Sequence, residues 1–234
     1  MINKNQFETY FYLTKEKFNI AVFEKDLPQP IFFTEQKIIN NTKDFDFKNL
    51  ESLIEKQIYL VEKNIDNFID EIFLIIDDQT TLEVTVSYKK RFEGLEVNDQ
   101  DLKYLLTEIK QQIYSSYEKF FIAHFLIDKF IFDQDEFDIF PKGKKCKNLF
   151  VNIRIILLKK DLIMKLKKLF KYKHILIEKS FCANYIRNFF GNEPKDLMQM
   201  SKEIKDGCNI SEVAIIPKKT EKKGFFDRFF HFFS

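Results

Sequence analysis

The side chains whose types could support catalysis or metal binding are three histidines and one pair of adjacent aspartates. His124, His174 and His231 lie far apart, and none has a partner at HxxxH or HExxH spacing. We therefore expect each histidine to be a surface or strand residue. Asp77 and Asp78 follow the apolar run "EIFLII", which is typical of a turn at a strand end and only weakly of an acid pair. The spacing predicts no catalytic residue and no enzyme.

Two further patterns resemble metal sites, but neither has the residues that such a site requires. The stretch "DQDEFD" at 133–138 has the aspartate spacing that begins a calcium loop. Asp138 takes the place of the required glycine, and Lys144 takes the place of the closing glutamate. The cysteines have no CxxC spacing, which argues against a disulfide framework and a zinc ribbon. They are Cys146, Cys182 and Cys208. We expect no metal, no nucleotide and no cofactor.

The sharpest functional signal is "GFFDRFFHFFS" at the C-terminus. Six of the nine residues 225–233 are phenylalanine, and on a helix they cover an arc of about 160° with the polar residues opposite. Such a helix is roughly 15 Å long, half of a ~30 Å hydrocarbon core, so it predicts a helix lying in the membrane interface. The predicted membrane-binding residues are Phe225, Phe226, Phe229, Phe230, Phe232, Phe233, Lys222, Lys223 and Arg228. The alternatives are docking in a partner's groove or on the protein's own core.

Charge is unevenly spread although the net charge is only +2. Residues 41–140 carry 11 Lys+Arg against 22 Asp+Glu, whereas residues 142–174 carry 12 Lys+Arg against one acid, Asp161. This asymmetry favours an anionic partner for the basic segment, or a solvated basic face. We name Lys165, Lys167 and Lys168 as candidate protein-interaction residues, and nucleic-acid binding by 142–174 as the alternative function.

Hydrophobic periodicity predicts an α+β fold. A β-hairpin and a third short strand precede residue 45, and a helix capped by Asp46 follows. From there the predicted order is helix, strand, strand, helix capped by Asn98, strand, strand, basic helix from Asp161, strand, helix. We expect one mainly antiparallel sheet covered by helices, with a C-terminal amphipathic helix. The predicted parts are 1–45 hairpin, 46–190 α+β domain, 191–223 linker and 224–234 membrane-targeting helix.

This order resembles the bacterial cell-division protein family FtsA, an actin-like ATPase that ties the FtsZ ring to the inner membrane. Segment 46–190 resembles its SHS2-type 1C subdomain, on the stretches "NLESLIEKQI", "LEVNDQDLKYLLTEIKQQI", "FFIAHFLIDKFIFDQDEF" and "NLFVNIRIILLKKDLIMKLKKLF". The tail stands where that family carries its membrane-targeting sequence, and the N-terminal hairpin resembles the start of the actin-like core. The resemblance implies a membrane tether and scaffold for division proteins.

One departure from the family removes the ATP site from this expectation. The family's first phosphate loop contains glycine, and here the matching turn is "LTKEK" at 13–17. The second half of the actin-like core, which binds the FtsZ tail, has no counterpart after residue 191.

The expected function is therefore a reduced adaptor without ATPase activity. It would be cytoplasmic and peripheral on the inner face of the cell membrane at the division site, because no signal peptide or spanning segment is read. The expected partners are anionic lipids, division proteins including possibly FtsZ, and further copies of the chain.

Overall fold

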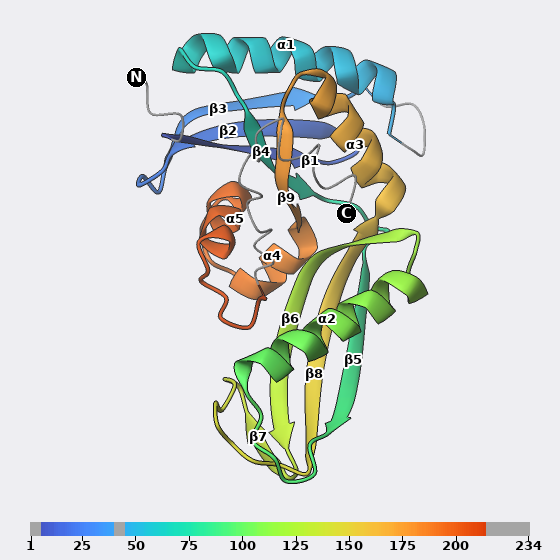
Figure 1. The fold of residues 1–234 in the computed structure, drawn as a ribbon. Coiled ribbons are helices and arrows are strands. Elements are labelled where there is room, and N and C mark those ends of the chain that lie inside the picture. The colour runs from blue at the N-terminus through green and yellow to red at the C-terminus, as the bar shows by residue number, and fades with distance from the viewer. Residues whose placement is uncertain (1–5, 40–44, 214–234) are drawn as a thin grey trace, which may run out of the picture.

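The computed structural model describes residues 6–39 and 45–213. Over these residues the chain forms two β-sheets and five helices, so the predicted α+β class is confirmed. Figure 1 shows the first sheet with its helices as the upper body, and the second sheet with one helix as the lower body.

The first sheet has five strands in the order β3-β2-β1-β4-β9. Its strands are β1 (Phe7–Leu13), β2 (Lys17–Glu24), β3 (Pro30–Lys37), β4 (Glu71–Ile76) and β9 (Leu176–Cys182). The first three strands form an antiparallel meander, while β1, β4 and β9 run parallel to one another. The carboxyl ends of the three parallel strands therefore meet at one edge of the sheet.

The turn between β1 and β2 is fixed by Thr14. Its hydroxyl accepts hydrogen bonds from the backbone N–H groups of Glu16 (3.1 Å) and Lys17 (3.0 Å), and its own N–H donates to the Lys17 carbonyl (2.9 Å). A Ser or Thr hydroxyl that bonds the next backbone groups supports a tight turn without glycine.

Four helices flank this sheet. They are α1 (Phe47–Ile65), α3 (Lys160–Tyr172), α4 (Ala183–Phe190) and α5 (Leu197–Lys205). Asp46 caps α1 as predicted, because its carboxylate accepts the Asn49 N–H at 3.2 Å. Figure 1 shows α1 and α3 on one side of the sheet and α4 and α5 on the other.

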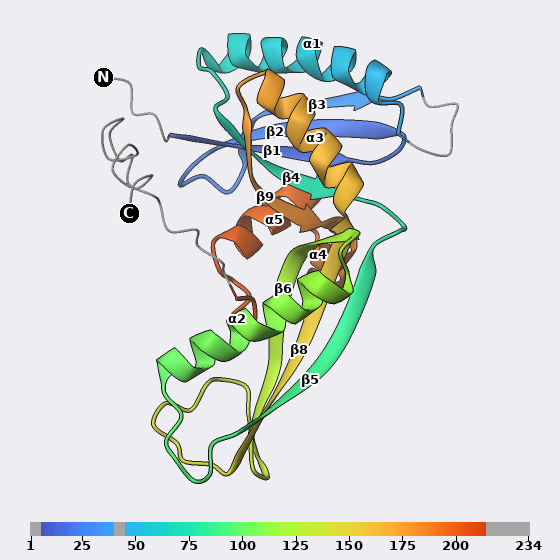
Figure 2. The same cartoon turned by 45° about the vertical axis from the view of Figure 1, so that its right-hand side comes forward.

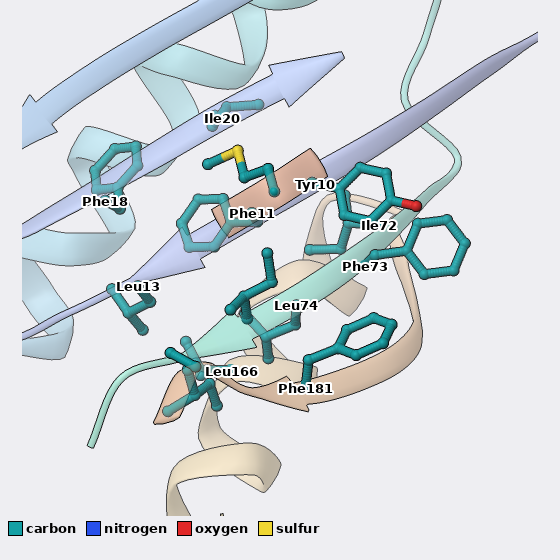
Figure 3. Packing of buried hydrophobic residues seen from close by; sticks show 14 of the residues in the cluster. Tyr10, Phe11, Leu13, Phe18, Ile20, Ile72, Phe73, Leu74, Leu166 and Phe181 are labelled. Atoms are coloured by element: carbon teal, nitrogen blue, oxygen red, sulfur yellow. The ribbon is translucent and has the colours of Figure 1, made fainter. Parts of the chain in front are cut away.

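The main hydrophobic core fills the space between this sheet and its helices (Figure 3). Phe11 lies at its centre, stacked on Phe18 at 5.1 Å between ring centroids and meeting the edge of Phe170 from α3 at 5.1 Å. On the opposite face of the sheet, Tyr10 stacks on Phe73 at 5.0 Å. The N-terminal strand thus contributes to both faces of the core.

The second sheet is antiparallel, in the order β5-β8-β6-β7. Its strands are β5 (Leu82–Arg91), β6 (Phe120–Phe132), β7 (Asp135–Phe137) and β8 (Asn148–Lys159), and helix α2 (Asp99–Ser116) covers one face. Asn98 caps α2 as predicted and forms a capping box with Asp101.

The predicted single sheet is corrected to two. The period-2 pattern identifies strands, but it contains no signal that β4 pairs with β1 while β5, six residues later, joins another sheet. As a consequence, segment 1–45 supplies three of the five strands of the first sheet, and the predicted boundary at residue 46 falls inside that sheet.

One helix within the predicted linker 191–223 belongs to the core. Helix α5 buries Met198, Met200 and Ile204 in the main cluster. The predicted membrane-targeting helix 224–234 lies outside the described residues.

Candidate functional site

A groove of about 490 Å³ lies where the two sheets meet. Its walls come from β4 and β9 of the first sheet, from β6 and the end of α2 in the second, and from α3, α5 and residues 212–213. Its apolar lining residues are Phe73, Tyr114, Phe121, Ile122, Ala123, Phe125, Ile177 and Val213. A volume of this size accommodates several side chains of a bound segment.

Four lysines line the same groove: Lys110, Lys167, Lys179 and Lys205. Lys110 lies over the Tyr114 ring at 5.7 Å and Lys167 over the Phe121 ring at 5.0 Å. Burial lowers the pKa of Lys110, which means that this ammonium has lost part of its hydration. The groove therefore combines an apolar lining with both cations and acids, because Glu71, Glu178 and Glu212 also line it.

Ser180, on the outer strand β9, also lines the groove. Its hydroxyl oxygen is buried and has no hydrogen-bond partner in the structure, and the residue is 3% exposed. A buried polar group without a partner is destabilising by about 1–3 kcal/mol, so a ligand group that reaches Ser180 would remove that cost.

A buried polar cluster around His124 adjoins the groove through Lys179 and Glu212, which line it. The His124 Nδ1 lies 3.0 Å from the Glu212 Oε1, and the Nε2 accepts the Cys182 backbone N–H at 3.0 Å. Glu212 also receives Lys179 Nζ at 2.9 Å and the Tyr185 hydroxyl at 3.2 Å. Because the Nε2 is an acceptor, His124 is neutral and donates from Nδ1.

This cluster fixes the segment that leads to the tail. The Ser211 backbone carbonyl accepts the Ile127 N–H at 2.8 Å, and the Val213 N–H donates to the Phe125 carbonyl at 2.9 Å. Glu212 forms an antiparallel bridge with Leu126 between these two bonds. Residues 211–213 are therefore held on β6, beside the groove.

We expect acidification below about pH 6.5 to destabilise the protein through His124. Burial lowers the pKa of His124, so the unfolded chain takes up a proton first as the pH falls. The stabilisation from burying neutral His124 is fully present above the pKa of this histidine in the unfolded chain. It is lost as the pH falls from that value to the lower pKa in the folded protein. The free energy of unfolding should fall by up to about 1.4 kcal/mol per pH unit in that window.

Urea unfolding at pH 7.5, 6.5 and 5.5 measures this slope. His124→Gln should remove most of it, whereas His174→Asn is the matched control, because His174 is exposed and its φ of 60° suits asparagine. An equal slope in the wild type and His124→Gln would contradict the assignment.

A second polar cluster occupies the carboxyl edge of the parallel strands. The Arg187 guanidinium donates to Asp77 Oδ2 at 2.6 Å and to the Tyr12 hydroxyl at 2.9 Å, and that hydroxyl donates to Asp77 at 2.8 Å. Burial alone would raise the pKa of Asp77, yet the hydrogen bonds from Arg187 and Tyr12 hold that pKa below its usual range. Burial also raises the pKa of Tyr12 to about 12.

Asp78 has a separate structural role, since its carboxylate accepts the Thr80 hydroxyl at 2.6 Å and the Thr80 N–H at 3.1 Å. The neighbouring aspartates thus form a turn, as expected, and each serves different partners.

The basic segment 142–174 is divided among distant parts of the fold. Lys142 and Lys144 pair with Asp99 and Asp135 at the far end of the second sheet, while Lys173 pairs with Glu55 of α1 in the upper body. Between them lies β8, which is mostly buried. The segment therefore does not form the single basic stripe that nucleic-acid binding along 142–174 requires.

The candidate interaction lysines all lie on α3, and each lies over a different aromatic ring. Lys165 lies over Phe47 at 5.1 Å, and Lys168 lies over Tyr172 at 5.9 Å. Lys167 is the one that reaches the groove, and their role in protein binding stays a prediction.

The predicted membrane-binding residues 222–233 lie outside the described residues, so their role stays a prediction. Among the described residues, no helix is long and apolar enough to span a membrane. In the same part of the chain, no cluster of three or more His, Cys, Asp or Glu side chains could hold a metal ion.

Sequence reasoning missed the groove, Glu212 and Arg187. His124 and Glu212 are 88 residues apart, and Asp77 and Arg187 are 110 residues apart, so no local spacing could have linked them. The only sequence signal was position, because Asp77 follows a buried strand where polar side chains of parallel sheets converge.

No family model and no curated protein matches the chain. Among solved structures, the chain is similar to one titled "PilM-PilN type IV pilus biogenesis complex", with a TM-score of 0.50 at 5% identity. The cytoplasmic domain of EpsL, an inner membrane component of the type II secretion system of Vibrio cholerae, gives 0.35 at 10% identity. A Bacteroides thetaiotaomicron protein described as having an actin-like ATPase fold and unknown function gives 0.34 at 14% identity.

The three alignments cover 78%, 77% and 81% of this chain, and 49%, 57% and 58% of the respective solved chains. The chain thus spans about half the length of the structures it matches. Only the first TM-score reaches 0.5. The described residues therefore share their α+β fold with part of the PilM-PilN structure.

Proposed function

We propose that this chain is an adaptor at the membrane surface, which binds a segment of a partner protein in the groove between its two sheets. The observation that carries the proposal is the position of residues 211–213. They are hydrogen-bonded to β6 beside the groove, and they lead directly into the sequence with the predicted membrane-binding residues. Partner binding and membrane attachment would therefore originate at the same place on the fold.

The groove suits an extended, apolar segment with acidic side chains. Aromatic and aliphatic residues line it, and Lys110 and Lys167 hold their ammonium groups over aromatic rings. Acidic side chains of a bound segment would lie near these cations, and such charge complementarity improves specificity and association rate. The outer strand β9 adds a second element of recognition, because a segment that extends a sheet is bound through its backbone.

The shared fold supports an assembly role. The structure with a TM-score of 0.50 is titled as a complex of two proteins in type IV pilus biogenesis. By analogy, we propose that this chain joins a multiprotein assembly at the inner membrane. A narrower form of the proposal, which rests on the resemblance to FtsA, places that assembly at the division site and includes division proteins among the partners.

Site-specific photo-crosslinking of the full chain tests the proposal. A photoreactive phenylalanine analogue would replace Tyr114 in the groove, and Tyr59 on α1 is the matched control because both aromatic rings are exposed. The chain is bound to vesicles of 70% phosphatidylcholine and 30% phosphatidylglycerol and mixed with membrane-protein extract of its source organism.

We expect a crosslinked protein at position 114 but not at position 59, and loss of that product when Ala123→Arg fills the groove. Vesicle flotation of Ala123→Arg should equal the wild type, because the substitution leaves the predicted membrane-binding residues 222–233 unchanged. Crosslinks that are the same at both positions, or that survive Ala123→Arg, would contradict partner binding in the groove. Failure of the wild type to float would instead contradict the proposed attachment to the membrane.

A further inference from the structure

The long open edge of the second sheet is strand β5. It pairs with β8 along its whole length, from Leu82 to Arg91, and it is the first strand in the order β5-β8-β6-β7. Figure 2 shows no helix or strand of residues 6–39 and 45–213 beyond β5 on that side, while α2 lies over one face of the sheet. The opposite edge is the three-residue strand β7. An open strand edge of ten residues presents backbone groups that another strand can bond.

We propose that β5 pairs with β5 of a second copy of this chain, antiparallel and centred on Val86, to form one continuous sheet across a two-fold axis. This inference goes beyond the proposed function and does not depend on it.

The two faces of β5 restrict how such a pair can form. Leu82, Val84, Val86 and Tyr88 face the α2 side and are half-buried, while Glu83, Thr85, Ser87 and Lys89 are exposed. A two-fold axis perpendicular to the sheet keeps each row on its own side. Shifting the register by one residue would place apolar side chains opposite charged ones, so only shifts of two residues compete.

Charge selects among those registers. Centring on Val86 places Glu83 opposite Lys89 of the second copy, and the symmetry repeats this pair. Thr85 then lies opposite Ser87, and Val84 opposite Tyr88. Opposite charges and aromatic–β-branched pairs across strands are stabilising.

Centring on Thr85 places Glu83 opposite Ser87 and loses the charged pair. Centring on Ser87 keeps a charged pair, Glu83 opposite Arg91, but brings the cations at 89–91 of the two copies two residues closer together. A parallel arrangement would bring the cations at 89–91 of both copies together, which like-charge repulsion disfavours. Of the two antiparallel registers that keep a charged pair, the one centred on Val86 therefore holds the cations of the two copies further apart.

Both charged side chains are available for this contact. Glu83 lies 4.0 Å from Arg154 Nε, at the limit of an ion pair, and Lys89 lies over the Phe150 ring at 5.1 Å. Each retains an exposed side chain on the open strand. The contact would be modest in solution and would strengthen where copies share a membrane, because their effective concentration rises.

A charge-swap series measured by sedimentation equilibrium on the full chain tests the proposal. Glu83→Lys should weaken dimerisation about tenfold, because two attractive pairs become repulsive. Lys89→Glu should do the same, and the double variant Glu83→Lys/Lys89→Glu should return within about threefold of the wild type. Glu51→Lys on α1 makes the same charge change at an exposed position away from β5, and should have no effect.

A cysteine experiment tests the register independently. In a Cys208→Ser background the remaining native cysteines, Cys146 and Cys182, are buried. Val86→Cys should then form an intermolecular disulfide on oxidation, because each Val86 faces its symmetry mate. Val84→Cys should not, because its symmetry mate lies about four residues further along the strand.

A wild type that stays monomeric at every concentration would overturn the proposal. So would a double swap that fails to restore dimerisation, or a Val84→Cys variant that crosslinks as readily as Val86→Cys.

Discussion

Truncating Phe11 to alanine should lower the free energy of unfolding by about 3–5 kcal/mol. Phe11 is 1% exposed and contacts aromatic rings from both β2 and α3. The substitution removes the transfer free energy of the ring and leaves a cavity between elements that cannot close in, since β1 is hydrogen-bonded to strands on both sides. Because folded domains are stable by about 5–15 kcal/mol, this is a large part of the total.

Urea denaturation followed by far-UV circular dichroism measures this effect, with Phe33→Ala as the matched control. Phe33 lies on edge strand β3 and is 50% exposed, so its loss should change stability by less than about 1 kcal/mol. A loss below about 1 kcal/mol for Phe11→Ala would mean that the N-terminal segment is an appendage. A large loss is expected if it forms the centre of the first sheet.

Replacing Phe230 by aspartate should weaken binding to anionic vesicles roughly thirtyfold. On the predicted helix this position lies within the apolar arc. Half-burial of a phenylalanine is worth about 1 kcal/mol, and a negative charge near an anionic surface adds about 1 kcal/mol of repulsion. The residue lies outside the described residues, so this prediction depends on the sequence pattern alone.

Flotation with vesicles of 30% phosphatidylglycerol measures the binding. The matched control is His231→Asp, which adds the same charge on the predicted polar face and should weaken binding only about fivefold. Equal losses for the two variants would show that charge alone drives attachment. Unchanged flotation of Phe230→Asp would contradict the membrane-binding tail.

The features of the fold that could be predicted from the sequence are local ones. Asp46 and Asn98 were identified as helix caps because a capping side chain bonds backbone groups two or three residues away. The same reasoning applies to the inner face of α2, because helical neighbours are three or four residues apart. The apolar stripe in the sequence is Leu102, Leu105, Leu106, Ile109 and Ile113. Leu105, Ile109 and Ile113 are buried, and the other two are partly buried against the second core.

The partition into two sheets could not be predicted in this way. The pairing of β1 with β4 joins Phe11 to Leu74, and nothing in the sequence near either residue specifies the other. Periodicity reports which face of a strand is buried, but it does not report which strand lies beside it.

The candidate site has the same limitation in a stronger form. The groove is formed by segments from β4 to residue 213, and one of its lining residues, Glu212, pairs with His124. His124 was expected to be an ordinary surface or strand residue. It is a strand residue, but at 1% exposure it is buried, because a glutamate far along the chain satisfies its Nδ1.

The attachment of residues 211–213 to β6 also has a mechanical consequence. If the sequence after Val213 is anchored and the protein is pulled, the load enters the described fold at Val213. It passes through the backbone bonds to Phe125 and Ile127, and through Glu212 to His124, into the middle of β6. The second sheet would bear that load before the first sheet does, and α5 would be shielded until these bonds break. The rupture of these few bonds would set the force at which the anchor begins to unravel from the fold, so single-molecule pulling on Glu212→Gln should show earlier extension than the wild type.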